Sequence, residues 1–251
     1  MNTEAVKNLL YRMADDALII AHRNSEWTGL GPILEEDIAF SSIAQDKLGH
    51  ALALYTILNE LGEAEPDIIA FTRNEKDFCC SQLVEYPIGE YDFSLVRHFM
   101  FDTAEKLRYE LLQQSTFEPI AKLAKKVSGE IKYHTFHADT WIFQLGSKGN
   151  EESKARMQSA INEVYPIAFS IFEPSSFEDS LIADATFVGE VELQKRWVER
   201  ITSIVEGAGL KLPTIDVTSH YGGRNKFHTE HLQPLLDEMT VVFLLDPSAE
   251  W

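Results

Sequence analysis

Apolar residues recur every three or four positions along most of the chain, which is the spacing of one face of an α-helix. Proline and glycine gather between these periodic stretches, where they end helices. Two long stretches, 63–91 and 213–226, break the period with prolines, glycines and mixed polarity, and residues 174–187, with Pro174 and several serines, have the character of a loop. We therefore predict an all-α helical bundle in a single domain, residues 1–251, with two long irregular connections. The predicted helices cover about 3–27, 34–61, 92–114, 116–146, 150–172, 189–206 and 229–245.

Polar residues interrupt the apolar faces of four predicted helices. Lys47 lies inside the stripe of the second helix with His50 at its edge, and His134 lies inside the stripe of the fourth. Glu26 and Asp102 fall on the buried sides of the first and third helices. A buried polar group needs a hydrogen-bond partner, and a buried charge needs a counter-charge. If these helices pack together, the five side chains can meet in one layer; taken singly, each can also be satisfied separately or extend to the surface.

This set matches the di-iron carboxylate site of ferritin-like bundles, but incompletely. Such a site takes one carboxylate from each of two helices and a Glu-x-x-His pair from each of the other two. Here Lys47 stands three residues before His50, and Ile131 three before His134, where glutamates are required. A lysine ammonium repels a metal cation and can neutralise the remaining acids. We therefore predict a ferritin-like four-helix core with a vestigial di-iron site, without metal or catalytic residues, formed by Glu26, Lys47, His50, Asp102, Ile131 and His134.

Two flanking carboxylates keep a metal-binding alternative open. Asp46 is four residues before His50, and Glu130 is four before His134, so each pair lies on one helix face and can chelate an ion. A related alternative is an enzyme with one iron, held by the two histidines together with Glu26 and Asp102 at the bundle centre. The lysine and isoleucine at the glutamate positions argue against both.

Charge and cysteine content narrow the classes of protein. Lys and Arg total 22 against 40 Asp and Glu, a net charge of -18, which disfavours binding to nucleic acid or to an anionic membrane. No run of about 18 apolar residues predicts a membrane span, and the first residues, MNTEAVKNLLYRMADD, do not fit a signal peptide. The only cysteines are the adjacent Cys79 and Cys80, which cannot staple a fold. These features predict a cytoplasmic protein in a reducing compartment.

The segment GGRNKFHTEH, residues 222–231, is basic within an acidic chain. Arg224, Lys226 and His228 precede a helix that Thr229 can cap. Cationic side chains ahead of a helix N-terminus can bind an anion, such as a phosphate group or a carboxylate of a partner protein. The alternative is a capped, solvated loop whose glycines set the backbone shape.

Four segments of the chain are distinctive: LEEDIAFSSIAQDKLGHALALY at 34–55, AFTRNEKDF at 70–78, EIKYHTFHADTW at 130–141 and GGRNKFHTEHLQPLLDEM at 222–239. Through these segments the chain resembles the C subunits of the bacterial multicomponent phenylacetyl-CoA epoxidases, and the resemblance covers almost its whole length. NSEWTG at 24–29 is also similar to the stretch that bears the first-helix carboxylate in the catalytic A subunits.

The resemblance implies a ferritin-like structural subunit that stabilises an A subunit in a heteromeric core. In that family the A subunit carries the intact Glu-x-x-His pairs, the di-iron centre and the catalysis, and a separate reductase supplies electrons. The complex converts phenylacetyl-CoA to a ring epoxide with molecular oxygen and NADPH. This chain is then expected to hold no cofactor of its own and to help shape the channel for the CoA ester. A free-standing module that binds acyl-CoA or a helical partner, and a homodimer of the isolated chain, remain open alternatives.

Overall fold

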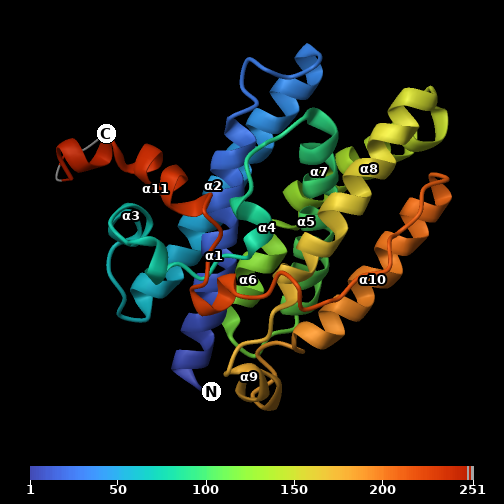
Figure 1. The fold of residues 1–251 in the computed structure, drawn as a ribbon. Coiled ribbons are helices and arrows are strands. Elements are labelled where there is room, and N and C mark those ends of the chain that lie inside the picture. The colour runs from blue at the N-terminus through green and yellow to red at the C-terminus, as the bar shows by residue number, and fades with distance from the viewer. Residues whose placement is uncertain (248, 250–251) are drawn as a thin grey trace.

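The computed structural model describes residues 1–247 and 249, and every regular element within them is helical (Figure 1). This confirms the all-α prediction. No helix in this part of the chain combines the length and the hydropathy that crossing a bilayer requires. The long helices are α1 (Thr3–Ser25), α2 (Leu34–Glu60), α5 (Tyr91–Leu112), α7 (Ser128–Phe143), α8 (Glu151–Ala168) and α10 (Glu190–Gly207).

Four of these helices form the core of the bundle. Helix α1 runs antiparallel to α2 along most of its length, and α5 packs against α7, with α8 and α10 on its other sides (Figure 1). The apolar stripes of the sequence face inward and form one continuous core. Trp197 of α10 is fully buried in it, stacks on Tyr165 of α8 at a centroid distance of 5.6 Å, and donates its indole N–H to the carbonyl of Met100.

Local sequence explains where several helices begin and end. The side chain of Asn150 accepts a hydrogen bond from the Ser153 backbone N–H at 2.8 Å and so caps the N-terminus of α8. The helix predicted over 116–146 is instead two helices, α6 (Glu118–Lys126) and α7, separated at Val127. Ser128 and Gly129 are weak helix formers, and the Ser128 hydroxyl donates to the Lys125 carbonyl at 2.9 Å, which ends α6 there.

The irregular segments contain short helical turns and one long crossing. After α10 the chain runs back across the molecule to α11, which lies near α3 (Figure 1). We call residues 211–231 of this crossing the C-terminal strap. The short elements are α3 (Pro66–Phe71), η1 (Glu75–Asp77), α4 (Gln82–Glu85), η2 (Gln144–Lys148), η3 (Phe169–Phe172), α9 (Glu178–Ala183), η4 (Gly223–Asn225), α11 (Leu232–Thr240) and η5 (Phe243–Leu245).

Candidate functional site

Lys47 of α2 is fully buried, and its ammonium contacts two carboxylates of α5. Lys47 Nζ lies 2.5 Å from Asp102 Oδ1 and also donates to Glu105 Oε2. Burial alone would lower the pKa of Lys47, but the two carboxylates outweigh burial and raise that pKa above its ordinary value. Burial acts to raise the pKa of Asp102, yet the same ammonium holds it well below its usual range. All three groups are therefore charged at neutral pH.

Each of the two predicted histidines contacts a carboxylate of the facing helix, one on α2 and one on α7. His50 Nε2 of α2 lies 2.8 Å from Glu130 Oε2 of α7, and His134 Nε2 of α7 lies 3.0 Å from Asp46 Oδ2 of α2. His134 Nδ1 also lies 3.2 Å from Asp102 Oδ1. The same-helix chelating pairs considered from the sequence do not form, because each carboxylate extends across the seam to the facing helix. These side chains therefore link α2 directly to α7.

A second polar layer continues this cluster toward the end of the bundle at which α2 begins. His98 Nδ1 lies 2.6 Å from Asp102 Oδ2, and His98 Nε2 lies 3.2 Å from His137 Nδ1. His137 Nε2 lies 3.0 Å from Glu36 Oε2, and Trp141 Nε1 donates to Glu36 Oε1 at 2.6 Å. Burial lowers the pKa of His98, which favours the neutral imidazole. The carboxylates and histidines thus form one connected chain of polar contacts through the bundle interior.

Four members of this cluster were not among the residues predicted from the sequence: Glu36, His98, Glu105 and His137. Two of them carry a spacing signal, since His98 is four residues before Asp102 and Glu105 is three residues after it. Residues three or four apart share one helix face, so the neighbours of a buried carboxylate were identifiable as candidates. Glu36 stands four residues before Phe40 and His137 three residues after His134, and their pairing depends on how α2 and α7 are aligned.

Glu26 does not join the cluster, which corrects the prediction from the sequence. It follows the last residue of α1 with 32% of its side chain exposed, and it accepts a hydrogen bond from Arg23 at 2.7 Å. The reason is axial position: Lys47 stands 13 residues beyond Leu34, about 20 Å along the helix at about 1.5 Å per residue, whereas Glu26 lies at the α1–α2 turn. Glu105 takes its place beside the lysine. Ile131 is buried on the face of α7 that also carries the predicted histidine.

The donor set of the central cluster does not fit a di-iron centre. Asp102, Glu105 and His134 each offer a ligand atom, and these atoms lie within 4.8 Å of one another. However, the ammonium of Lys47 already contacts both carboxylates, so a divalent cation at that point would meet a like charge at close range. Chemically the cluster is a network of ion pairs and hydrogen bonds that links α2, α5 and α7.

The basic C-terminal segment is largely internal, which corrects its prediction as an anion or partner contact. Arg224 is buried, pairs with Asp16 at 2.6 Å, and donates to the backbone carbonyls of Cys79 and Ile171. His228 contacts Glu85 at 2.7 Å with its side chain 2% exposed. The acidic partners of this segment, Asp16 and Glu85, belong to α1 and α4, which lie far from the strap in the sequence. Lys226 alone of the three predicted residues is exposed.

A family model for phenylacetic acid catabolic proteins matches residues 1–251. The chain belongs to the phenylacetic acid catabolic protein family. It is 30% identical to the C subunit of 1,2-phenylacetyl-CoA epoxidase of Escherichia coli (strain K12) over 241 residues, which are 96% of each protein. It is also 24% identical to the A subunit of the same epoxidase over 197 residues, 76% of this chain and 63% of that protein.

Membership of the phenylacetic acid catabolic proteins confirms two predictions. The resemblance to C subunits of the epoxidases holds over nearly the full length of both chains. The family is ferritin-like, in agreement with the α1, α2, α5 and α7 core. The weaker match to an A subunit shows that the chain is also similar in sequence to that kind of subunit.

Proposed function

We propose that this chain is a non-catalytic structural component of a phenylacetyl-CoA epoxidase, in the position of the C subunit, and that it stabilises a di-iron A subunit. The observation that carries this is the buried ammonium of Lys47 between Asp102 and Glu105. It occupies a position where a ferritin-like di-iron site places a glutamate, so a protein cation neutralises the acids there. The 30% identity to a C subunit over 96% of the chain supports the assignment.

The proposed scaffold role also has support from the surface. Helices α2 and α7, which the cluster joins, expose large apolar side chains on their outer faces. Ile38 is 60% exposed and Phe136 is 70% exposed. Large exposed apolar patches mark protein interaction sites, and we propose that these side chains together form one. The remaining members of this set, which we call the α2–α7 face, are Leu34, Leu48, Leu52, Tyr133 and Phe143.

The occupant that we propose for the α2–α7 face is the A subunit. The relative that shares this fold at 24% identity is itself the A subunit of an epoxidase that also has a C subunit. Interface cores favour aromatic and aliphatic anchors with few charges, which is the composition of this face. The irregular segment 63–91 is partly engaged inside the chain through Arg73, which pairs with Asp15 at 2.6 Å.

Reconstitution with the A subunit tests the proposed function. The purified chain is mixed with the A subunit and the reductase of the same pathway, and size-exclusion chromatography with light scattering measures assembly. We expect a stable heteromeric complex, epoxidation of phenylacetyl-CoA only when the A subunit is present, and a large loss of turnover when this chain is omitted. Full turnover by the A subunit with reductase alone, or turnover by this chain with reductase alone, would contradict the proposal.

Charged substitutions on the α2–α7 face test its role in assembly. Ile38→Glu and Phe136→Glu each place a charge where an apolar anchor is buried in the complex. Loss of a central anchor costs about 2 kcal/mol or more, which is about 30-fold in Kd. The matched control is Val191→Glu on α10, a residue that is 78% exposed on another helix. Unchanged affinity for the A subunit in both α2–α7 variants would place the interface elsewhere.

A further inference from the structure

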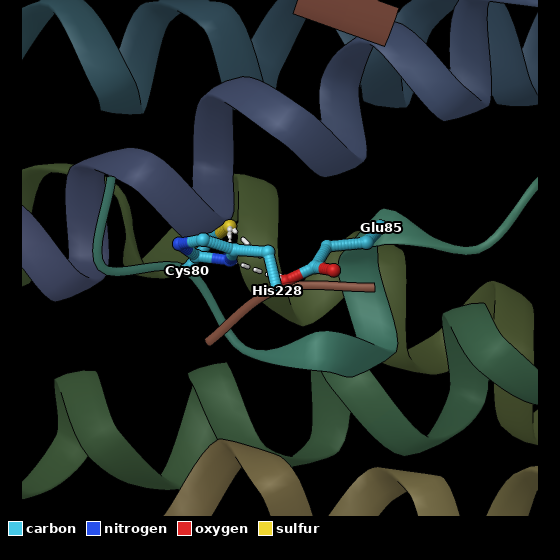
Figure 2. A group of neighbouring side chains, drawn as sticks. All are labelled: Cys80, Glu85 and His228. Atoms are coloured by element: carbon cyan, nitrogen blue, oxygen red, sulfur yellow. Dashed lines mark hydrogen bonds and ion pairs between the residues drawn. The ribbon is translucent and has the colours of Figure 1, made fainter. Parts of the chain in front are cut away.

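A second cluster of metal-ligand side chains lies where the C-terminal strap meets the segment around α4 (Figure 2). It contains Cys80 and Glu85 from that segment and His228 from the strap. Cys80 Sγ lies 3.7 Å from Glu85 Oε1 and 3.9 Å from His228 Nδ1, and the latter two atoms lie 2.7 Å apart. Cys80 and Glu85 are fully buried, and only 2% of the His228 side chain is exposed. Figure 2 shows the ends of these three side chains converging from two parts of the chain.

Hydrogen bonds around the cluster aim the ligand atoms toward one point. His228 Nε2 lies 3.2 Å from the carbonyl oxygen of Phe78, so this nitrogen donates and leaves Nδ1 facing the cluster. Glu85 Oε2 accepts the backbone N–H of Thr229 at 2.6 Å, so Oε1 is the oxygen that remains. A second hydrogen bond that orients a ligating imidazole or carboxylate is the usual support of a metal site.

Nδ1 of His228 and Oε1 of Glu85 face each other and require a proton or a metal ion between them. Nδ1 of a neutral His228 whose Nε2 donates carries a lone pair, and it lies 2.7 Å from an oxygen of Glu85. Two lone pairs at this distance repel unless a proton or a metal ion lies between them. A proton satisfies the His–Glu pair only, whereas a metal ion also uses the third atom, the sulfur of Cys80.

We propose that Cys80, Glu85 and His228 bind one Zn²⁺ ion, with a water molecule as fourth ligand. Thiolate, imidazole and carboxylate are all zinc ligands, whereas Mg²⁺ and Ca²⁺ prefer sets made of oxygen alone. Tetrahedral zinc bonds of about 2.0–2.3 Å separate sulfur from nitrogen or oxygen by about 3.6 Å and nitrogen from oxygen by about 3.3 Å. The two sulfur distances already fit, and only the His228–Glu85 pair has to open, by about 0.6 Å.

Zinc at this point fastens the strap to the bundle. Cys80 and Glu85 are five residues apart, but His228 lies 143 residues after Glu85. Burial, with Glu85 and Asp16 nearby, raises the pKa of the Cys80 thiol well above its ordinary value, so the thiol keeps its proton without metal. Zinc binding therefore displaces that proton together with the one shared by His228 and Glu85. The bound state, with two anionic ligands and one divalent cation, is neutral overall.

Cobalt substitution tests the proposal on the full chain. The protein is treated with chelator, desalted and titrated with Co²⁺, which reports a thiolate ligand by a sulfur-to-cobalt charge-transfer band. We expect the band to saturate at one equivalent and to vanish when Zn²⁺ is added. Cys80→Ser is expected to abolish it, and His228→Gln to weaken metal binding by 100-fold or more. Cys79→Ser is the matched control, because the neighbouring cysteine is outside the cluster, and it should behave as the parent.

Thermal unfolding supplies a second readout. Saturating Zn²⁺ should raise the Tm of the parent and of Cys79→Ser by about 5 °C, and leave Cys80→Ser unchanged. A folded parent chain with no charge-transfer band overturns the proposal, as does a band that persists in Cys80→Ser. Neither result depends on the A subunit, so the zinc site and the proposed structural role succeed or fail separately.

Discussion

Lys47→Met is expected to lower the free energy of unfolding by about 3–5 kcal/mol at neutral pH, because it leaves Asp102 and Glu105 buried without their counter-charge. Methionine matches the length of the lysine stem, so the loss is chiefly electrostatic. The ammonium is fully buried and contacts both carboxylates, which excludes the solvent screening that weakens surface ion pairs. Urea unfolding followed by far-ultraviolet circular dichroism measures the difference.

The deficit of Lys47→Met should shrink as the pH falls from 7 to 4. In the parent chain the pKa of Asp102 is held well below its ordinary value, so its contribution is present above the unfolded pKa and is lost as the pH falls toward the folded one. In the variant the two carboxyls lack the lysine, and burial raises their pKa values, so protonation stabilises the folded variant as the pH falls. The protonation of the variant narrows the difference between pH 7 and 4, and the loss of the Asp102 contribution in the parent narrows it further only below the unfolded pKa of that group, about 3.9.

Two further variants show that the deficit comes from the broken ion pair. Lys132→Met removes an exposed lysine from α7 and should change stability by less than about 0.5 kcal/mol. Adding Asp102→Asn and Glu105→Gln to Lys47→Met removes the orphaned charges and should recover much of the loss at pH 7. A Lys47→Met deficit under about 1 kcal/mol that does not vary with pH would contradict the electrostatic account.

Restoring both missing glutamates is expected to create iron binding. Lys47→Glu with Ile131→Glu completes a Glu-x-x-His pair on α2 and another on α7, beside Asp102 and Glu105 of α5. The product has four carboxylates and two histidines, the donor count of a ferritin-like di-iron site, with both unpaired carboxylates on α5 instead of one on each of two helices. After anaerobic incubation with ferrous iron and desalting, we expect about two iron atoms per chain in the double variant and none in the parent.

The iron experiment uses a common background and a matched control. Both proteins carry Cys80→Ser, so that iron cannot bind at the cluster of Cys80, Glu85 and His228. Lys132→Glu with Val191→Glu repeats the two chemical changes at exposed positions and should bind no iron. Tightly held iron in the parent would contradict the proposed loss of the metal site, and the alternative of an enzyme with its own iron would return.

The periodic pattern of the sequence determined the helical elements and identified some of the residues of the central site. Hydrophobic spacing is local, since a helix places residues three and four apart on one face whatever surrounds it. It therefore located α1, α2, α5 and α7 within a few residues, except that the last was predicted as one helix together with α6. It also placed Lys47, His50 and His134 on inward faces, and Asp102 opposite them. Because Lys47 carries a positive charge at a position where a di-iron site needs a glutamate, the sequence alone indicated that it opposes metal binding.

Only the tertiary structure decided which of these residues meet. Contacts between helices depend on their axial alignment and rotation, which no local pattern encodes. For this reason Glu105, rather than Glu26, is the second partner of Lys47, and Asp46 contacts a histidine of the facing helix rather than its own. The path of the C-terminal strap is likewise long-range: it buries Arg224 against α1 instead of presenting it to solvent.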